Sequence, residues 1–278
     1  MEQSGALFMT ITALAVGVMR NVQSWLERYR VPSLPDYDVD AVMGFLPSRD
    51  PLARLPSGFE PWDALVVELP RLIAEKQVRA AVRSRLGDRR FDVGAILRRE
   101  DPAVTQRACL VLSMITHGYI WEGGDEDILT HLPAFLAVPL HSINKALGLP
   151  PILTYASCVL WNWRRLDVSK PPTIDNLHAI HTMGGGEDES FFFMLTTDME
   201  YRGSRGIALV AQALHAVAAS DEPGLTTTLS ALDGVLLDLV TVLARMPEGC
   251  RPEVRASAMA SVCWIECLRR SHSPKHCQ

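Results

Sequence analysis

Two short stretches of the sequence carry side chains that could take part in chemistry. Residues 152–164 are predicted to form a helix, and Tyr155, Cys158 and Asn162 share one of its faces because their spacing is i, i+3 and i+7. In residues 189–201, Phe192 and Thr196 lie four residues apart and share a second helix face. Together these two faces offer aromatic rings, a thiol, an amide and a hydroxyl.

Each stretch has two interpretations. The three phenylalanines at 191–193 are compatible with an ordinary core helix, and Cys158 with a small buried hydrophobe. Alternatively, Phe192 stacks on a flat ligand while Thr196 offers it one hydrogen bond. Neither of the two faces holds a pair of carboxylates or a Ser–His–Asp arrangement, so neither face supplies a strong general base near neutral pH. An active site built from these residues would therefore depend on a cofactor for its reactivity.

The elements that must position these side chains are helices. Apolar residues recur at steps of three and four, and no segment alternates with the two-residue period of a strand, so the predicted fold is all-α. Pro70 predicts a kink or break in the first helix, and the helix at 104–121 is apolar nearly all round, which predicts that it is buried. The glycines at 184–186 follow no predicted strand and are expected to form a flexible loop. The predicted helices cover residues 62–73, 104–121, 140–147, 189–201, 205–219 and 225–246.

Composition limits the class of protein. The 278 residues are 48% hydrophobic and 21% charged, as in folded soluble proteins, and the net charge of -5 argues against nucleic-acid binding. Only two of the six cysteines precede residue 250, which favours a reducing compartment and predicts a cytoplasmic protein. The apolar run at 5–19 is shorter than the roughly 20 residues of a membrane span and has the wrong flanking charges for a signal peptide. Membrane association is therefore not expected.

Several blocks, in a consistent order from residue 34 to 254, resemble the indoleamine 2,3-dioxygenase family. The most specific is Pro-Pro-Ile-Leu-Thr-Tyr-Ala-Ser-Cys-Val-Leu at 150–160. The residues in these blocks and their spacing are closer to fungal-type members than to animal ones. The other blocks are Leu-Pro-Asp-Tyr at 34–37, Gly-Phe-Leu-Pro at 44–47, Asp-Pro-Leu at 50–52, Leu-Ala-Val-Pro at 136–139, Asp-Asn-Leu at 175–177, Phe-Phe at 192–193 and Arg-Met-Pro-Glu at 245–248.

The resemblance implies a fold and an activity. It implies a small helical domain, residues 32–148, packed on a larger helical haem domain whose first part is residues 149–254, with an N-terminal extension at 1–31 and a divergent tail at 255–278. It further implies haem b as cofactor, and tryptophan or a related indoleamine and O2 as substrates, with N-formylkynurenine of the kynurenine pathway as product. The implied distal-pocket residues are Tyr155, Cys158, Phe192, Phe193 and Thr196.

The sequence departs from the family pattern after residue 254. The family's proximal histidine lies beyond the length of this chain, and Ala260 stands where the resemblance places the arginine that binds the substrate carboxylate. We therefore expect a truncated chain that contains no metal ligand and is inactive alone. Cys267 and His272 are too close together for a zinc finger.

The alternative to a dioxygenase is a non-catalytic helical interaction protein of the same ancestry, which binds a partner through an uncovered apolar stripe such as that at 225–243. Its oligomeric state is left open.

Overall fold

The computed structural model describes residues 33–99 and 101–250 together with Ser24. Most of them are helical, and a single pair of short strands is present among them, which confirms the predicted all-α class. The larger helices are α2 (Glu60–Ala74), α3 (Val78–Leu86), α5 (Pro102–Trp121), α6 (Ala134–Ala146), α7 (Glu187–Ala218) and α8 (Glu222–Leu243). Shorter elements are η1 (Leu34–Tyr37), α4 (Val93–Leu97), η2 (Gly124–Glu126), η3 (Ala156–Leu160), η4 (Ile174–Asn176), α9 (Met246–Gly249), and the strands β1 (Trp163–Arg165) and β2 (Leu177–Ala179).

The chain separates into two compact units, which we describe one at a time. Among the described residues, the core unit consists of 46–199 and 242–250, and the hairpin unit of 33–45 and 200–241. Both α7 and α8 contribute residues to each unit. The predicted domain boundary at residue 148 falls inside the core unit and remains a prediction.

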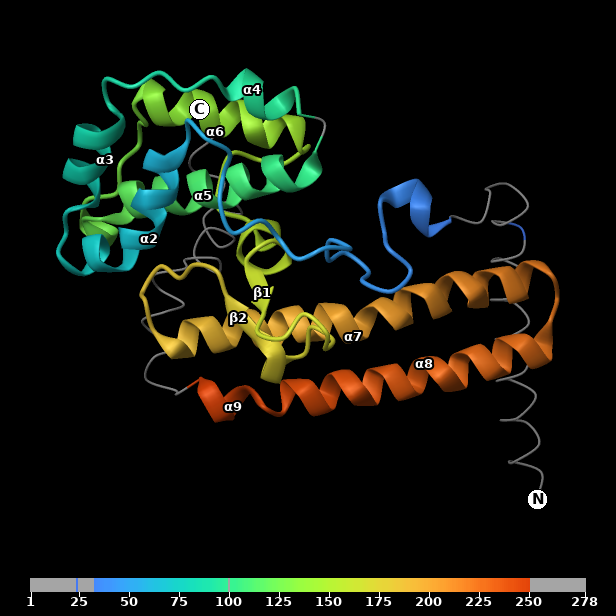
Figure 1. Ribbon diagram of the computed structural model, residues 1–278. Coiled ribbons are helices and arrows are strands. Elements are labelled where there is room, and N and C mark those ends of the chain that lie inside the picture. The colour runs from blue at the N-terminus through green and yellow to red at the C-terminus, as the bar shows by residue number, and fades with distance from the viewer. Residues whose placement is uncertain (1–23, 25–32, 100, 251–278) are drawn as a thin grey trace. The chain divides into compact units, whose positions relative to one another are not determined.

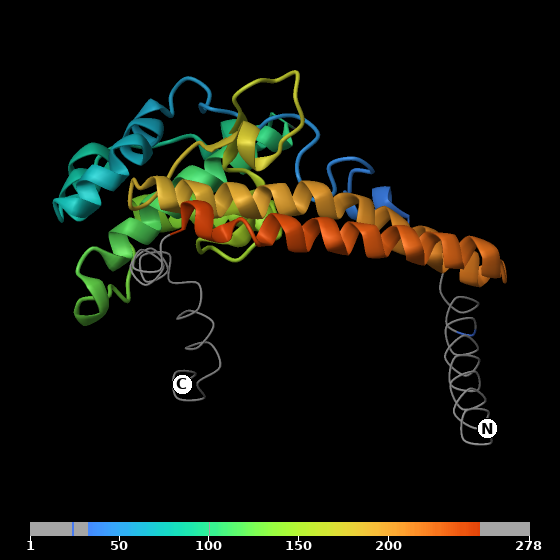
Figure 2. The same ribbon diagram turned by 90° about the horizontal axis from the view of Figure 1, so that it is seen from below.

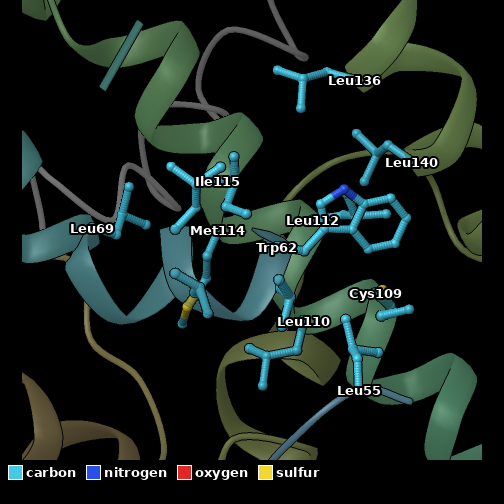
Figure 3. Packing of buried hydrophobic residues seen from close by; sticks show 14 of the residues in the cluster. Leu55, Trp62, Leu69, Cys109, Leu110, Leu112, Met114, Ile115, Leu136 and Leu140 are labelled. Carbon is cyan, nitrogen blue, oxygen red and sulfur yellow. The ribbon is translucent and has the colours of Figure 1, made fainter. Parts of the chain in front are cut away.

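The core unit is built around α5. This helix begins at Pro102, with the Asp101 side chain accepting a hydrogen bond from the backbone N–H of Ala103 at 3.1 Å. Residues 108–112 of α5 are all fully buried, which confirms the prediction of an apolar, enclosed helix. Helices α2, α3, α4 and α6 surround it (Figure 1). Figure 3 shows Trp62 of α2 gathered with Leu112 of α5 and Leu140 of α6 in this core.

A kink or break was predicted at Pro70. Helix α2 continues through this residue, so there is no break, and the kink stays a prediction. Pro70 instead contacts the glycine run at 184–186. Gly185 has φ +75°, and a Cβ at this position would lie 2.8 Å from Cβ of Pro70. A side chain is therefore excluded both by the left-handed backbone and by the proline ring. Gly185 therefore allows this loop to pack closely against α2.

The helix predicted over residues 152–164 is also wrong. Only Tyr155 and, with π geometry, Ala156–Leu160 are helical, and the chain then enters β1. The reason is a non-local pairing: β1 lies antiparallel to β2, with Trp163 opposite Ala179 and Arg165 opposite Leu177. Two strands of three residues each are too short to produce a recognisable alternating pattern in the sequence.

The hairpin unit joins the C-terminal half of α7 to α8 (Figures 1 and 2). Two helices were predicted at 189–201 and 205–219, whereas α7 is one helix of 32 residues. Within this unit α7 packs on α8 at Gly206, where a Cβ would lie in ordinary van der Waals contact, 3.4 Å from Val235 and 3.5 Å from Leu232. Gly44 in turn packs on Ser204, whose hydroxyl donates to the carbonyl of Val42 at 2.6 Å.

Part of the predicted apolar stripe of α8 is exposed. Leu229, Leu236, Val240 and Leu243 are each about half exposed or more. Residues Glu222–Gly249 satisfy the length and hydropathy of a membrane span, with a mean hydropathy of 1.6. Length and composition alone do not distinguish such a helix from a helix of a soluble protein. The predictions for the apolar run at 5–19 and for the tail at 255–278 lie outside the described residues.

Candidate functional site

The candidate site begins at the π-helical turn Ala156–Leu160, which we call the π turn. Thr154 and Ser157 start it by reciprocal capping: the N–H of Thr154 donates to Oγ of Ser157 at 3.0 Å, and the N–H of Ser157 donates to Oγ1 of Thr154 at 3.3 Å. The N–H of Trp161 donates to the carbonyl of Ala156 at 3.0 Å, five residues earlier, which is the π-helical spacing. Single π turns of this kind are frequent at functional sites.

The second part of the site lies on α7. Phe193 and Leu195 are buried, whereas Phe192 is 36% exposed and Thr196, one turn later, is partly exposed. The hydroxyl of Thr196 donates to the carbonyl of Phe192 at 2.8 Å. Its only proton is thereby used within the helix, so the Thr196 oxygen is left with acceptor capacity toward a ligand.

Thr197 connects the two parts. It is fully buried, and its hydroxyl lies 3.1 Å from the carbonyl oxygen of Val159 in the π turn and 3.0 Å from that of Phe193 on α7. The π turn is thus held directly against the helix that carries Phe192 and Thr196. Both belong to the core unit.

The structure divides the five predicted pocket residues into two groups. Tyr155, Phe192 and Thr196 are partly accessible, while Cys158 and Phe193 are each 2% exposed. Burial raises the pKa of the Cys158 thiol, and the neighbouring carboxyl of Glu189 raises it further. Cys158 therefore remains a protonated, apolar side chain. The pocket role of these five residues stays a prediction.

The sequence predicted that Asn162 shares a helix face with Tyr155 and Cys158, and this prediction is wrong. It is fully buried, and its side chain makes two hydrogen bonds with the backbone of His181: Nδ2 donates to the carbonyl at 2.8 Å, and Oδ1 accepts from the N–H at 2.9 Å. Asn162 is therefore a structural residue that fixes the segment after β2.

Sequence reasoning missed Glu189 as a second residue that organises this segment. Its carboxyl accepts hydrogen bonds from the N–H groups of Met183 at 2.7 Å and Gly184 at 2.6 Å. Burial raises its pKa, and the two backbone donors oppose that rise. A glutamate at the start of a predicted helix normally indicates a solvated first turn, so the sequence contained no signal of this burial.

The accessible side chains of the site are of types that line binding sites for flat, apolar groups. Phe192 can contact such a face, and the buried Phe193 and Leu195 behind it keep this part of α7 apolar. Phe192 and Thr196 offer no axial ligand for haem iron, and Tyr155 could offer only its phenolate oxygen. In the described part of the chain, no group of three or more His, Cys, Asp or Glu side chains is arranged to hold a metal ion.

The sequence matches the family model described as indoleamine 2,3-dioxygenase over residues 33–256. It is 35% identical to indoleamine 2,3-dioxygenase 1 of Mus musculus over 216 residues, which is 77% of this chain and 49% of that protein. It is 31% identical to indoleamine 2,3-dioxygenase of Saccharomyces cerevisiae, over 81% of this chain and 50% of that protein. A protein named myoglobin from Haliotis madaka is 29% identical over 79% of this chain and 54% of its own length.

The matched region contains the whole candidate site, including the π turn and the first half of α7. The chain spans about half the length of the curated relatives it matches. The identity to the mouse protein is no lower than that to the yeast protein, so the closer resemblance to fungal-type members stays a prediction. The extent of the family match and its agreement with an all-helical fold lead to one conclusion: this chain belongs to the indoleamine 2,3-dioxygenase family.

Proposed function

We propose that this chain contributes the substrate-side surface of a haem-dependent dioxygenase that cleaves the indole ring of tryptophan to N-formylkynurenine. The observation that carries the proposal is the family match over residues 33–256, which includes the π turn and Phe192 and Thr196. The absence of a strong base among Tyr155, Cys158, Phe192 and Thr196 supports chemistry in which the cofactor, and not a side chain, supplies the reactivity.

Each accessible side chain has a defined task in this proposal. Phe192 packs against the flat indole, and Thr196 accepts a hydrogen bond from an N–H of the substrate because its own proton is donated to the carbonyl of Phe192. Cys158 stays protonated and excludes water from behind the π turn. Haem b, when bound, supplies the activation of O2.

The proposal is tested by supplying the part of the family polypeptide that the chain does not span. The 278-residue chain is co-expressed with the segment of the mouse relative that follows the matched region, and the co-purified proteins are reconstituted with haem. We expect a Soret band and formation of N-formylkynurenine from tryptophan under O2 and a reductant. The chain alone is expected to form no product. A co-purified, haem-loaded sample that forms no product contradicts the proposed activity.

A second candidate function is reversible O2 binding without turnover. It is favoured by the similarity to the protein of Haliotis madaka named myoglobin. The same reconstituted sample separates the two functions, because a reversible O2 spectrum without loss of tryptophan supports O2 binding, whereas product formation supports the dioxygenase.

Thr196 gives a sharper prediction for the substrate side. In the reconstituted protein, Thr196→Val is expected to raise KM for tryptophan about 3- to 10-fold, because one hydrogen-bond acceptor is lost. Thr196→Ser retains the hydroxyl and is the matched control, with KM close to that of the unmodified protein. Equal KM values for the valine and serine variants, measured by steady-state kinetics, would show that the hydroxyl does not contact the substrate.

We further propose a cytoplasmic location. Cys109 and Cys158 are free and buried in the structure, which supports a protein that folds under reducing conditions.

A further inference from the structure

The end of the π turn leaves the backbone carbonyl of Val159 without a partner in its own helix. In a helix that continued past Leu160, the carbonyl of Val159 would accept from an N–H four or five residues later. The chain instead leaves the helix at Trp161 and enters β1 at Trp163, so this intrahelical partner is lost. Val159 is buried, and an unsatisfied carbonyl there would be costly.

Thr197 supplies the donor that this carbonyl needs. The hydroxyl has a single proton and lies at comparable distances from two acceptors, 3.1 Å from the carbonyl of Val159 and 3.0 Å from that of Phe193. Phe193 is on the same helix four residues earlier, so that bond is available to any buried threonine on a helix. The bond to Val159 is specific to this fold, because it joins residues 38 positions apart.

The position of Thr197 relates this bond to the candidate site. Thr197 directly follows Thr196, and Phe193 directly follows Phe192, so Thr197 lies on the buried face of α7 next to the face that carries the accessible pair. On the other side, Val159 lies between Cys158 and Leu160 within the π turn. A change in how the turn seats on α7 therefore moves Cys158 and the neighbouring Tyr155 relative to Phe192 and Thr196.

We propose that Thr197 is a positioning residue: its hydroxyl fastens the π turn to α7 at Val159 and so fixes the spacing between the two halves of the ligand site. The consequence for a ligand rests on the proposed function. The contact between Thr197 and Val159 does not depend on the proposed function, because it concerns only residues within the core unit. Thr197 acts through Val159 and is not placed in contact with substrate.

The first test follows the Cys158 thiol in the 278-residue chain, without cofactor. Thr197→Val removes the hydroxyl and nearly preserves the shape, and Thr197→Ser retains the hydroxyl. Reaction with a small thiol reagent is followed by site-resolved mass spectrometry, with the fully buried Cys109 on α5 as the internal control. We expect Thr197→Val to increase the labelling rate of Cys158 about tenfold with little change at Cys109, because the unsatisfied carbonyl favours local opening of the turn. Thr197→Ser should label like the unmodified chain.

Equal acceleration at Cys158 and Cys109 would indicate general destabilisation and overturn the proposal, and so would an unchanged rate at Cys158. The second test measures KM for tryptophan in the reconstituted protein, where Thr197→Val should raise KM several-fold and Thr197→Ser should not. If Cys158 responds as expected while the reconstituted protein has no activity toward tryptophan, the fastening stands and the proposed function fails.

Discussion

Replacing Arg107 with leucine is expected to destabilise the protein by about 3–5 kcal/mol, because it leaves a partly buried carboxylate without its cation. The Arg107 side chain is 1% exposed, and its Nη2 lies 2.6 Å from Oδ1 of Asp63, whose side chain is 17% exposed. The other carboxylate oxygen accepts from the N–H of Leu55 at 2.7 Å. The pair therefore joins α5, α2 and the segment before α2 inside the core unit. Urea unfolding at pH 7 measures the loss.

Two further variants show whether the ion pair of Arg107 and Asp63 accounts for the loss of stability. Nε and Nη1 of Arg107 have no hydrogen-bond partner within the described structure, and burial lowers the pKa of the guanidinium, so the arginine itself is poorly accommodated. The double variant Arg107→Leu with Asp63→Asn keeps an acceptor for Leu55 and removes both charges. It should be more stable than the single variant. The partly exposed pair of Arg85 and Glu68 is the control, and Arg85→Leu should cost about 1 kcal/mol or less. A loss below about 1 kcal/mol for Arg107→Leu would contradict the interpretation.

Elements defined by local pattern could be predicted from the sequence, and elements defined by distant partners could not. The continuous apolar character of residues 104–121 predicted the buried helix α5 correctly. At 152–164 an equally apolar pattern predicted a helix wrongly, because the local preference is overridden by pairing with residues 177–179. Residues 201–205 were predicted to interrupt a helix, yet α7 continues through them.

In the candidate site, too, the residues set by local pattern could be predicted and those set by distant partners could not. Phe192 and Thr196 were recognisable because a helix places residues four apart on one face. Thr197 was not, since its role depends on a carbonyl exposed by a π turn that the sequence did not predict. Asn162 was assigned to the right segment and the wrong role. Its buried hydrogen bonds to His181 exist only because β1 and β2 pair.

His181 is expected to make the protein sensitive to mild acid. Its ring is buried, its Nε2 has no hydrogen-bond partner in the described part of the chain, and Asn162 holds its backbone in place. Burial and, as the smaller cause, the positive charge of Arg107 together lower the pKa of the imidazole from 6.5 to about 3. The unfolded chain therefore binds a proton at a higher pH than the folded protein does.

The sign of the effect follows from that difference. The contribution of neutral His181 to the free energy of unfolding is fully present above pH 6.5 and is lost as the pH falls from 6.5 toward 3. A shift of this size corresponds to at most about 4–5 kcal/mol. Glu189 opposes the trend, because burial raises its folded pKa, so its stabilising contribution is present at low pH and declines as the pH rises above 4.5.

The measurement compares the free energy of unfolding between pH 7 and pH 4 for the unmodified chain and for His181→Leu. The free energy of unfolding of the leucine variant should decrease much less on acidification, because no buried imidazole remains to be protonated. His131→Leu, at an exposed histidine, is the control and should follow the unmodified chain. In Arg107→Leu, NMR titration should place the His181 pKa higher than in the unmodified chain, since the positive charge that disfavours imidazolium is gone. Parallel pH profiles for the unmodified chain and His181→Leu would instead assign the acid sensitivity to other groups, and the buried ring would then have no measurable linkage to folding.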